Sequence, residues 1–148
     1  MLAELPRRIT YEILESADYT VFDHVQFSLV GSDVTLVGSV TTREKSDGFA
    51  SAVAAIPGVA GVENELRVLS SSSEDERMRK RLFKRIYEDP SFEEFAELPN
   101  PPVHIIVDSK YVTLTGIVSS QIEKLAAEAI VRTTFGVRSV DNRLRVRE

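Results

Sequence analysis

Three arginines near the end of the chain have a spacing that suits binding better than catalysis. Arg143, Arg145 and Arg147 are two residues apart, so an extended strand would place all three side chains on one face. Strand alternation predicts that Ile106 and Ile117 face the same side. Guanidinium groups beside exposed apolar side chains suit an anionic surface such as phospholipid headgroups. The sequence therefore predicts a lipid or partner surface made of these five residues.

Residues for other kinds of chemistry are missing or scattered. The chain has no cysteine, which excludes disulfides, thiolate metal sites and a cysteine nucleophile. Its two histidines, His24 and His104, have no ligand partner at a metal-binding spacing. There is no GxGxxG, Walker or serine-elbow sequence, and the carboxylates form no obvious catalytic pair. We therefore predict no catalytic residue, no metal and no cofactor, and hence no enzyme.

A second set of residues is assigned a structural role because each member occurs twice. The glycines are expected at a strand irregularity or a helix end. Each asparagine has the inward parity of its strand, so we expect its amide to be buried and to hydrogen-bond the backbone. The set consists of Gly38, Gly58, Asn64, Gly116, Gly136 and Asn142.

The elements that carry these residues follow from an internal repeat. A shift of 78 residues aligns Val34–Val68 with the second half without a gap, so that VTLVGSV falls on VTLTGIV and GVAGVENELRV on GVRSVDNRLRV. We expect one domain over residues 1–69, a flexible serine-rich linker over 70–73 and a second domain over 74–148. Residues 1–69 carry 5 basic and 10 acidic side chains, whereas residues 70–148 carry 13 of each. A shared fold with different surfaces is indicated.

Each half is expected to fold as α-β-β-α-β, with two helices packed on one face of a three-stranded mixed sheet. The fold class is thus α+β, in two tandem units. We expect helix caps at Thr41, Ser73 and Ser120, each followed three residues later by a glutamate. The expected buried helix faces are Leu5, Ile9, Ile13 and Leu14; Met78, Leu82, Phe83 and Ile86; Phe49, Ala52, Val53 and Ile56; and Ile122, Ala126, Ile130 and Val131.

The strand ending in VTLVGSV or VTLTGIV and the closing GV-x-x-V-x-N-x-L-x-V resemble the BON domain, a bacterial module named for osmotic-shock and nodulation proteins. The resemblance covers nearly the whole chain in two copies. It implies a non-enzymatic protein of the periplasm or cell envelope that binds phospholipid surfaces or serves as an interaction module. The segment FEEFAELPNPP (92–102) is longer than its counterpart in the first half.

Two functions remain open from the sequence. The first is binding of the second domain to anionic phospholipid or to another envelope component. The alternative is a scaffold in which the acidic open sheet face of the first domain pairs with the basic open sheet face of the second. The pairing would occur within or between chains, with weak self-association. Nucleic acid is disfavoured by the net charge of −5 and the lack of stacking aromatics. No transmembrane stretch and no signal peptide are visible. The resemblance implies the periplasm. If the sequence is the full gene product, the missing signal peptide implies the cytoplasm instead.

Overall fold

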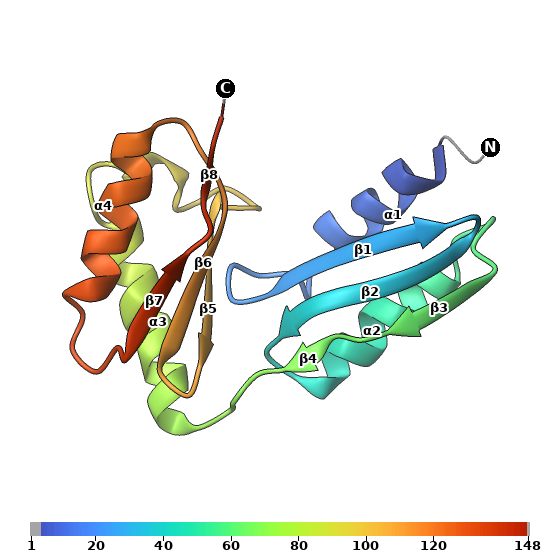
Figure 1. Cartoon of the computed structure of the whole chain (residues 1–148), viewed down its shortest axis with the longest axis horizontal. Coiled ribbons are helices and arrows are strands. Elements are labelled where there is room, and N and C mark those ends of the chain that lie inside the picture. The colour runs from blue at the N-terminus through green and yellow to red at the C-terminus, as the bar shows by residue number, and fades with distance from the viewer. Residues whose placement is uncertain (1–3, 148) are drawn as a thin grey trace. The chain divides into compact units, whose positions relative to one another are not determined.

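The computed structural model describes residues 4–147 and divides the chain into two compact units. The first unit comprises residues 1–69 and the second residues 70–148. Both have the predicted element order, helix, two strands, helix and closing strand (Figure 1). The α+β fold with a repeated unit is therefore confirmed.

From the second strand of each unit onward the corresponding elements have equal lengths, whereas the opening helix has 10 residues in the first unit and 15 in the second. The second unit adds a short 3₁₀ helix, η2, in its longer connection. The first unit contains α1 (Leu5–Leu14), β1 (His24–Val30), β2 (Asp33–Val40), α2 (Arg43–Ala54), β3 (Gly61–Asn64) and β4 (Arg67–Val68). The second unit contains α3 (Ser73–Tyr87), η2 (Glu93–Phe95), β5 (Val103–Asp108), β6 (Tyr111–Val118), α4 (Gln121–Arg132), β7 (Ser139–Asn142) and β8 (Arg145–Val146).

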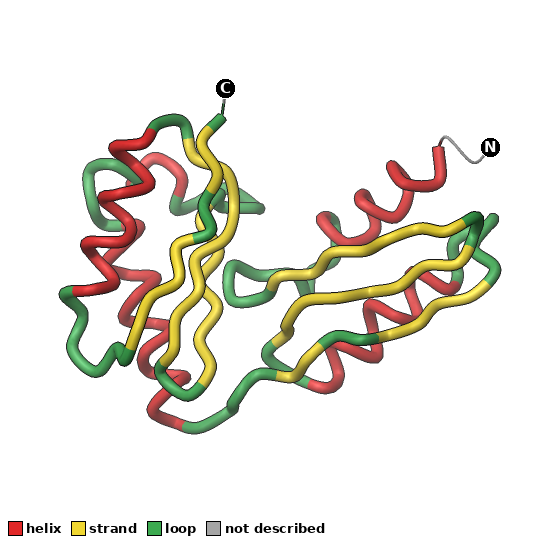
Figure 2. The backbone as a smooth tube through the Cα atoms, in the orientation of Figure 1, coloured by secondary structure: helices red, strands yellow, loops and turns green. Residues whose placement is uncertain are grey.

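Each sheet is mixed. β1 pairs antiparallel with β2, and both β3 and β4 pair parallel with β2. Leu36 is opposite Asn64 and Ser39 is opposite Arg67, so β3 and β4 are two pieces of one strand path in a single register. The expected three strands are thus present, with the third interrupted. In each unit the helices cover one face of the strands (Figure 2).

Apolar side chains from both helices and the central strand form each core. Ile9, Phe49 and Leu36 are buried in the first unit, as predicted from the helical and strand periods. Two predictions about the helix faces are wrong, because Leu14 is 43% exposed and Ile122 is 76% exposed. The helix α4 is apolar on two sides, so the sequence pattern did not settle which side faces the sheet.

Serine and threonine side chains cap three of the helices. The hydroxyl of Ser120 accepts a hydrogen bond from Glu123 N at 3.1 Å, as predicted. The predicted caps at Thr41 and Ser73 are each displaced by one residue, since Thr42 and Ser72 provide the capping oxygens. The observed cap follows the predicted residue at Thr41 and precedes it at Ser73, and in both cases either of the two adjacent hydroxyl residues could have served.

The repeated glycine in the middle of β2 and β6 permits close strand pairing. Gly38 and Gly116 have φ of +122° and +124°. A Cβ on either residue would lie 1.9 Å from a backbone oxygen of the opposing strand segment, that of His24 or Pro102. Glycine is therefore required at both positions. Gly58 and Gly136 also have positive φ and lie in the turns that follow α2 and α4.

The serine run is hydrogen-bonded to the second unit. Ser70 N donates to Asp108 Oδ1 at 2.9 Å, and Ser70 O accepts from Arg79 Nη2 at 2.7 Å. Ser72 caps α3, and Ser73 is its first residue. Leu69, one residue earlier, donates its N–H to Val40 O in the first unit at 2.8 Å. Residues 70–73 therefore have defined roles in the second unit.

Candidate functional site

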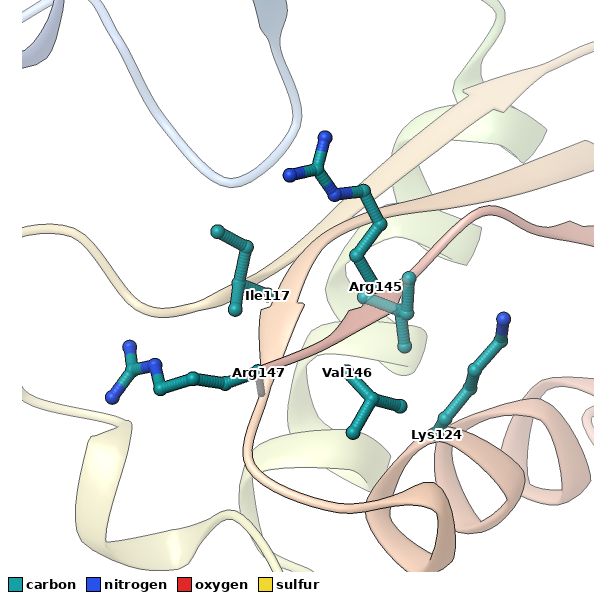
Figure 3. Close-up of a pocket in the computed structure, with 6 residues that line it drawn as sticks. Ile117, Lys124, Arg145, Val146 and Arg147 are labelled. Atoms are coloured by element: carbon teal, nitrogen blue, oxygen red, sulfur yellow. The ribbon is translucent and has the colours of Figure 1, made fainter.

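A hollow of about 550 Å³ lies where β6, α4 and the closing strand of the second unit meet. The end of β6 contributes Ile117 and the second turn of α4 contributes Lys124. The rest of the lining comes from the closing strand: Leu144, Arg145, Val146 and Arg147. In the view of Figure 3 the Ile117 side chain lies between those of Arg145 and Arg147, and Lys124 rises from the helix below Val146.

The hollow is positively charged and partly apolar. Lys124, Arg145 and Arg147 line it, and no carboxylate of residues 4–147 does. Over residues 4–147, none of these three cations forms an ion pair. Ile117 is 46% exposed, whereas Leu144 is only 1% exposed and forms part of the core beneath. Three cations around an accessible apolar side chain can hold an anionic group by charge and a neighbouring apolar group by contact.

Strand alternation brings three of the five predicted surface residues together. Ile117, Arg145 and Arg147 line the hollow. Arg143 is outside this lining, and its Nε donates to Asp141 Oδ2 at 2.8 Å, so its charge is balanced locally.

Ile106 corrects the prediction, because it is 8% exposed and cannot form part of an open surface. Ile105, Ile106 and Val107 are all buried, so β5 is covered on both faces and the alternation rule does not apply to it. An uninterrupted apolar run is the sequence signal for such a strand.

Lys124 was not predicted because it belongs to a helix. It is 21 positions before Arg145 in the sequence, and only the packing of α4 against the sheet makes the two residues neighbours. Leu144 and Val146 alternate with the arginines along the closing strand, so alternation places them on its other face. No sequence signal marks the edge of that strand as the place where these residues become part of a hollow.

Asn142 fixes the helix against the strand beside the hollow. Its Nδ2 donates to Lys124 O at 3.0 Å and to Glu128 Oε1 at 3.1 Å. Its Oδ1 accepts from Leu144 N at 3.2 Å. Ion pairing with Arg132 and the hydrogen bond from Asn142 lower the pKa of Glu128. The asparagine thereby positions Lys124 and Leu144, two lining residues, relative to each other.

Asn64 makes the equivalent contacts in the first unit with neutral partners. Its Nδ2 donates to Ser46 Oγ at 2.9 Å and to Ser46 O at 3.3 Å, and its Oδ1 accepts from Leu66 N at 3.1 Å. The expectation of a buried amide is wrong, since Asn64 is exposed and Asn142 is half-buried. Both lie on an edge strand, where the amide reaches the helix at the margin of the core. In each unit the Leu N–H bonds the asparagine side chain at the break between the two strand pieces.

The first unit has different residues at most of the positions that line the basic hollow. By the 78-residue shift, Ser39 stands for Ile117, Ser46 for Lys124 and Leu69 for Arg147. Two carboxylates, Glu63 and Glu65, occupy the neighbouring strand positions. A hydrogen bond with Glu63 and repulsion by its charge raise the pKa of Glu65. The charge is reversed at one of these strand positions, Glu65 against Arg143, whereas Glu63 corresponds to Asp141 and Arg67 to Arg145.

The described part of the chain contains neither a metal-binding cluster nor a membrane-spanning helix. Within residues 4–147 no group of three His, Asp or Glu side chains could hold a metal ion. Among the helices described, none has the length and apolar character needed to cross a bilayer. His24 is on β1 and His104 is on β5, in different units.

Comparison with known proteins identifies one family. The family model "BON domain" matches residues 8–70 and again residues 75–148. No curated protein matches the sequence. The solved structures that resemble the chain include two of CdsD, a structural protein of the Type III secretion system of Chlamydia trachomatis.

Both resemblances are distant. The first structure is 14% identical with a TM-score of 0.39, and the match covers 97% of this chain and 61% of that one. The second, a C-terminal domain, is 13% identical with a TM-score of 0.35, and the match covers 98% of both chains. The chain thus spans less than two thirds of the first structure's length.

Proposed function

The chain belongs to the BON domain family through both of its halves, and from this premise we propose that it is a non-enzymatic interaction protein whose second unit binds anionic phospholipid surfaces. The observation that carries the proposal is the hollow lined by Lys124, Arg145 and Arg147, with no carboxylate from the described part of the chain. These cations have no ion pair over residues 4–147, so an external anion can approach them without displacing an internal one.

The expected affinity is modest and depends on salt. Each basic residue close to an anionic bilayer contributes about 1 kcal/mol, so three give about 3 kcal/mol. Ile117 adds apolar contact at the level of the headgroups. The attraction is screened as ionic strength rises. Binding at low salt that weakens at high salt is therefore the expected behaviour.

Vesicle flotation tests the proposal. The full chain should float with phosphatidylglycerol vesicles at low salt and should not float with phosphatidylcholine vesicles. Replacing Arg145 and Arg147 together by glutamine should weaken binding by about thirtyfold, which corresponds to about 2 kcal/mol. The matched control is Arg143→Gln, in which the lost charge is already paired with Asp141. Failure to bind anionic vesicles at low salt would refute the proposal, as would equal losses in both variants.

A second candidate is a scaffold formed by pairing of the unlike surfaces, within or between chains. The raised pKa of Glu65 favours it, because two carboxylates that repel each other would gain from a basic partner such as the hollow. Light scattering over a range of concentration and salt tests association between chains. Self-association at low salt that is lost in a variant with Glu63→Lys and Glu65→Lys supports the scaffold. A chain that is monomeric under all conditions counts against it.

A further inference from the structure

The first unit has a free strand edge that the second unit closes with its own side chains. β1 is at the edge of its sheet, because β2 is its only paired neighbour. β5 has the same place in the second sheet. A free edge presents backbone N–H and C=O groups that another extended segment can pair with. The two edges differ in what covers these groups.

The register shows which backbone groups of β1 are available. Leu36 O accepts from Glu65 N at 2.8 Å, so the backbone of Leu36 points toward the third strand and away from β1. Phe27 is directly opposite Leu36 and forms the non-hydrogen-bonded pair with it. The N–H and C=O of Phe27 therefore point to the free edge, and those of Leu29 do so by the same parity. No side chain of residues 4–147 hydrogen-bonds either backbone.

In the second unit side chains from α3 bond part of the corresponding edge, where Val103 and Val107 have the strand positions of Val25 and Leu29. The Tyr87 hydroxyl accepts from Val103 N at 2.8 Å and donates to Val103 O at 2.7 Å. Arg79 Nη2 donates to Val107 O at 2.7 Å and is buried with it. Tyr87 also packs its ring on Phe83, with 4.9 Å between centroids. Thus α3 covers both ends of the β5 edge, with two hydrogen-bonding side chains and a pair of rings.

The corresponding residues of α1 cannot do this. Aligning the buried faces of α1 and α3 places Pro6 opposite Arg79, Thr10 opposite Phe83 and Leu14 opposite Tyr87. Tyr19, from the loop after α1, hydrogen-bonds the Val25 backbone in place of the Tyr87 contact. Nothing in α1 replaces Arg79.

A hollow of about 260 Å³ remains between α1 and β1. It is lined by Thr10, Ile13, Leu14, Val25, Gln26 and Phe27.

From these observations we propose that the groove between α1 and β1 is a peptide-binding site. The ligand is an extended segment of a partner protein that pairs with the backbone of Phe27 and Leu29 and inserts one aromatic side chain against Thr10 and Leu14. This is strand addition, in which backbone hydrogen bonds give affinity and the groove selects a side chain. The site is in the first unit and does not depend on lipid binding by the second.

Charge defines the rest of the ligand. Residues 1–69 carry 5 basic and 10 acidic side chains, so a basic segment is attracted and an acidic one is repelled. Glu15 and Asp18 are exposed directly after α1. The second unit closes its own edge with an arginine and a tyrosine, and these are the two side-chain types that the partner segment should supply.

Selection from a random nonapeptide library displayed on phage, with the full chain as bait, tests the site. Enriched peptides should combine an aromatic residue with lysine or arginine. A synthetic copy of the most enriched peptide, added to ¹⁵N-labelled protein, should shift the amide signals of Phe27 and Leu29 and slow their exchange with solvent. Absence of any enriched peptide, or shifts confined to other parts of the chain, would overturn the proposal.

A variant that makes the first unit resemble the second gives the sharper test. Thr10→Phe combined with Leu14→Tyr places rings in the groove, and peptide affinity should fall at least tenfold while the thermal transition is retained. The matched control is Tyr11→Ala, which alters the same helix at an exposed position outside the groove, and its affinity should stay within twofold of the parent. Unchanged binding by the double variant, with the fold intact, contradicts the site.

Discussion

Replacing Asn142 by leucine should destabilise the second unit more than the equivalent change at Asn64 destabilises the first. Asn142 joins α4 to the closing strand through three hydrogen bonds, and Leu144 N, one of its partners, belongs to a residue that is 1% exposed. Leucine has nearly the same size but neither donates nor accepts. The substitution therefore removes the polar contacts with little change in volume.

The magnitude follows from the partners. Loss of the hydrogen bond to the charged Glu128 lowers the free energy of unfolding by about 1.5–3 kcal/mol. Leaving the Leu144 N–H without an acceptor lowers it by about 1–3 kcal/mol. The contributions overlap, and the leucine side chain recovers part of the loss by burial. We expect a net loss of about 3 kcal/mol for Asn142→Leu. For Asn64→Leu we expect about 1–2 kcal/mol, because Asn64 is exposed and its partners in Ser46 are neutral.

Urea denaturation followed by circular dichroism measures the free energy of unfolding, and amide exchange at Leu144 reports the local contact. In Asn142→Leu the Leu144 amide should exchange faster than in the parent. Asn142→Asp is the control, since it keeps an acceptor for Leu144 N but loses both donors. Its loss should exceed that of leucine at neutral pH, because the new carboxylate faces Glu128. Equal destabilisation by Asn142→Leu and Asn64→Leu, or unchanged exchange at Leu144, would refute the reasoning.

Three further outcomes are expected. Gly116→Ala should cost about 3 kcal/mol or more, because the added Cβ would lie 1.9 Å from the opposing backbone oxygen; Gly31→Ala, with nothing within 4 Å, should cost only about 1 kcal/mol in urea denaturation. Glu63→Gln should stabilise the first unit at neutral pH. The pKa of Glu65 is raised by Glu63, and protonation of Glu65 removes the repulsion between the two carboxylates. The stabilisation by Glu63→Gln should therefore vanish as pH falls below about 4.5 in pH-dependent thermal melts. Ser72→Ala should lower stability by about 1 kcal/mol through loss of the α3 cap, whereas alanine at the next serine should have little effect.

The repeat made most of the fold predictable. Gly38 and Gly116, or Asn64 and Asn142, would be ambiguous as single residues, but their recurrence at a fixed shift indicates a structural requirement. The hairpin and the parallel closing strand follow from strand alternation and from the helix that separates them.

Predictions were less accurate where two choices had nearly equal sequence support. Ile122 and Leu125 form one apolar side of α4, and Ala127 and Ile130 form another. Only packing against the sheet shows that the second side is buried and the first exposed. Ile106 failed for the opposite reason, because its strand is apolar on both faces.

The candidate hollow was partly predictable. Arg145 and Arg147 follow from alternation along one strand. Lys124 joins them only through the tertiary fold, and the pairing of Arg143 with Asp141 removes a charge that the sequence pattern had counted. Sequence periodicity identifies a face of one strand, whereas a hollow depends on which elements meet at its edge.

The hydrogen bonds of Ser70 decide how the chain can be divided for separate expression of its halves. Leu69 belongs to the first sheet, while the N–H and C=O of Ser70 bond Asp108 and Arg79 of the second unit. A fragment that begins at the first residue of α3 would leave the buried Arg79 with Val107 O as its remaining partner. Recombinant forms of the second half should therefore start before Ser70, and a shorter fragment would report a damaged domain instead of an independent one.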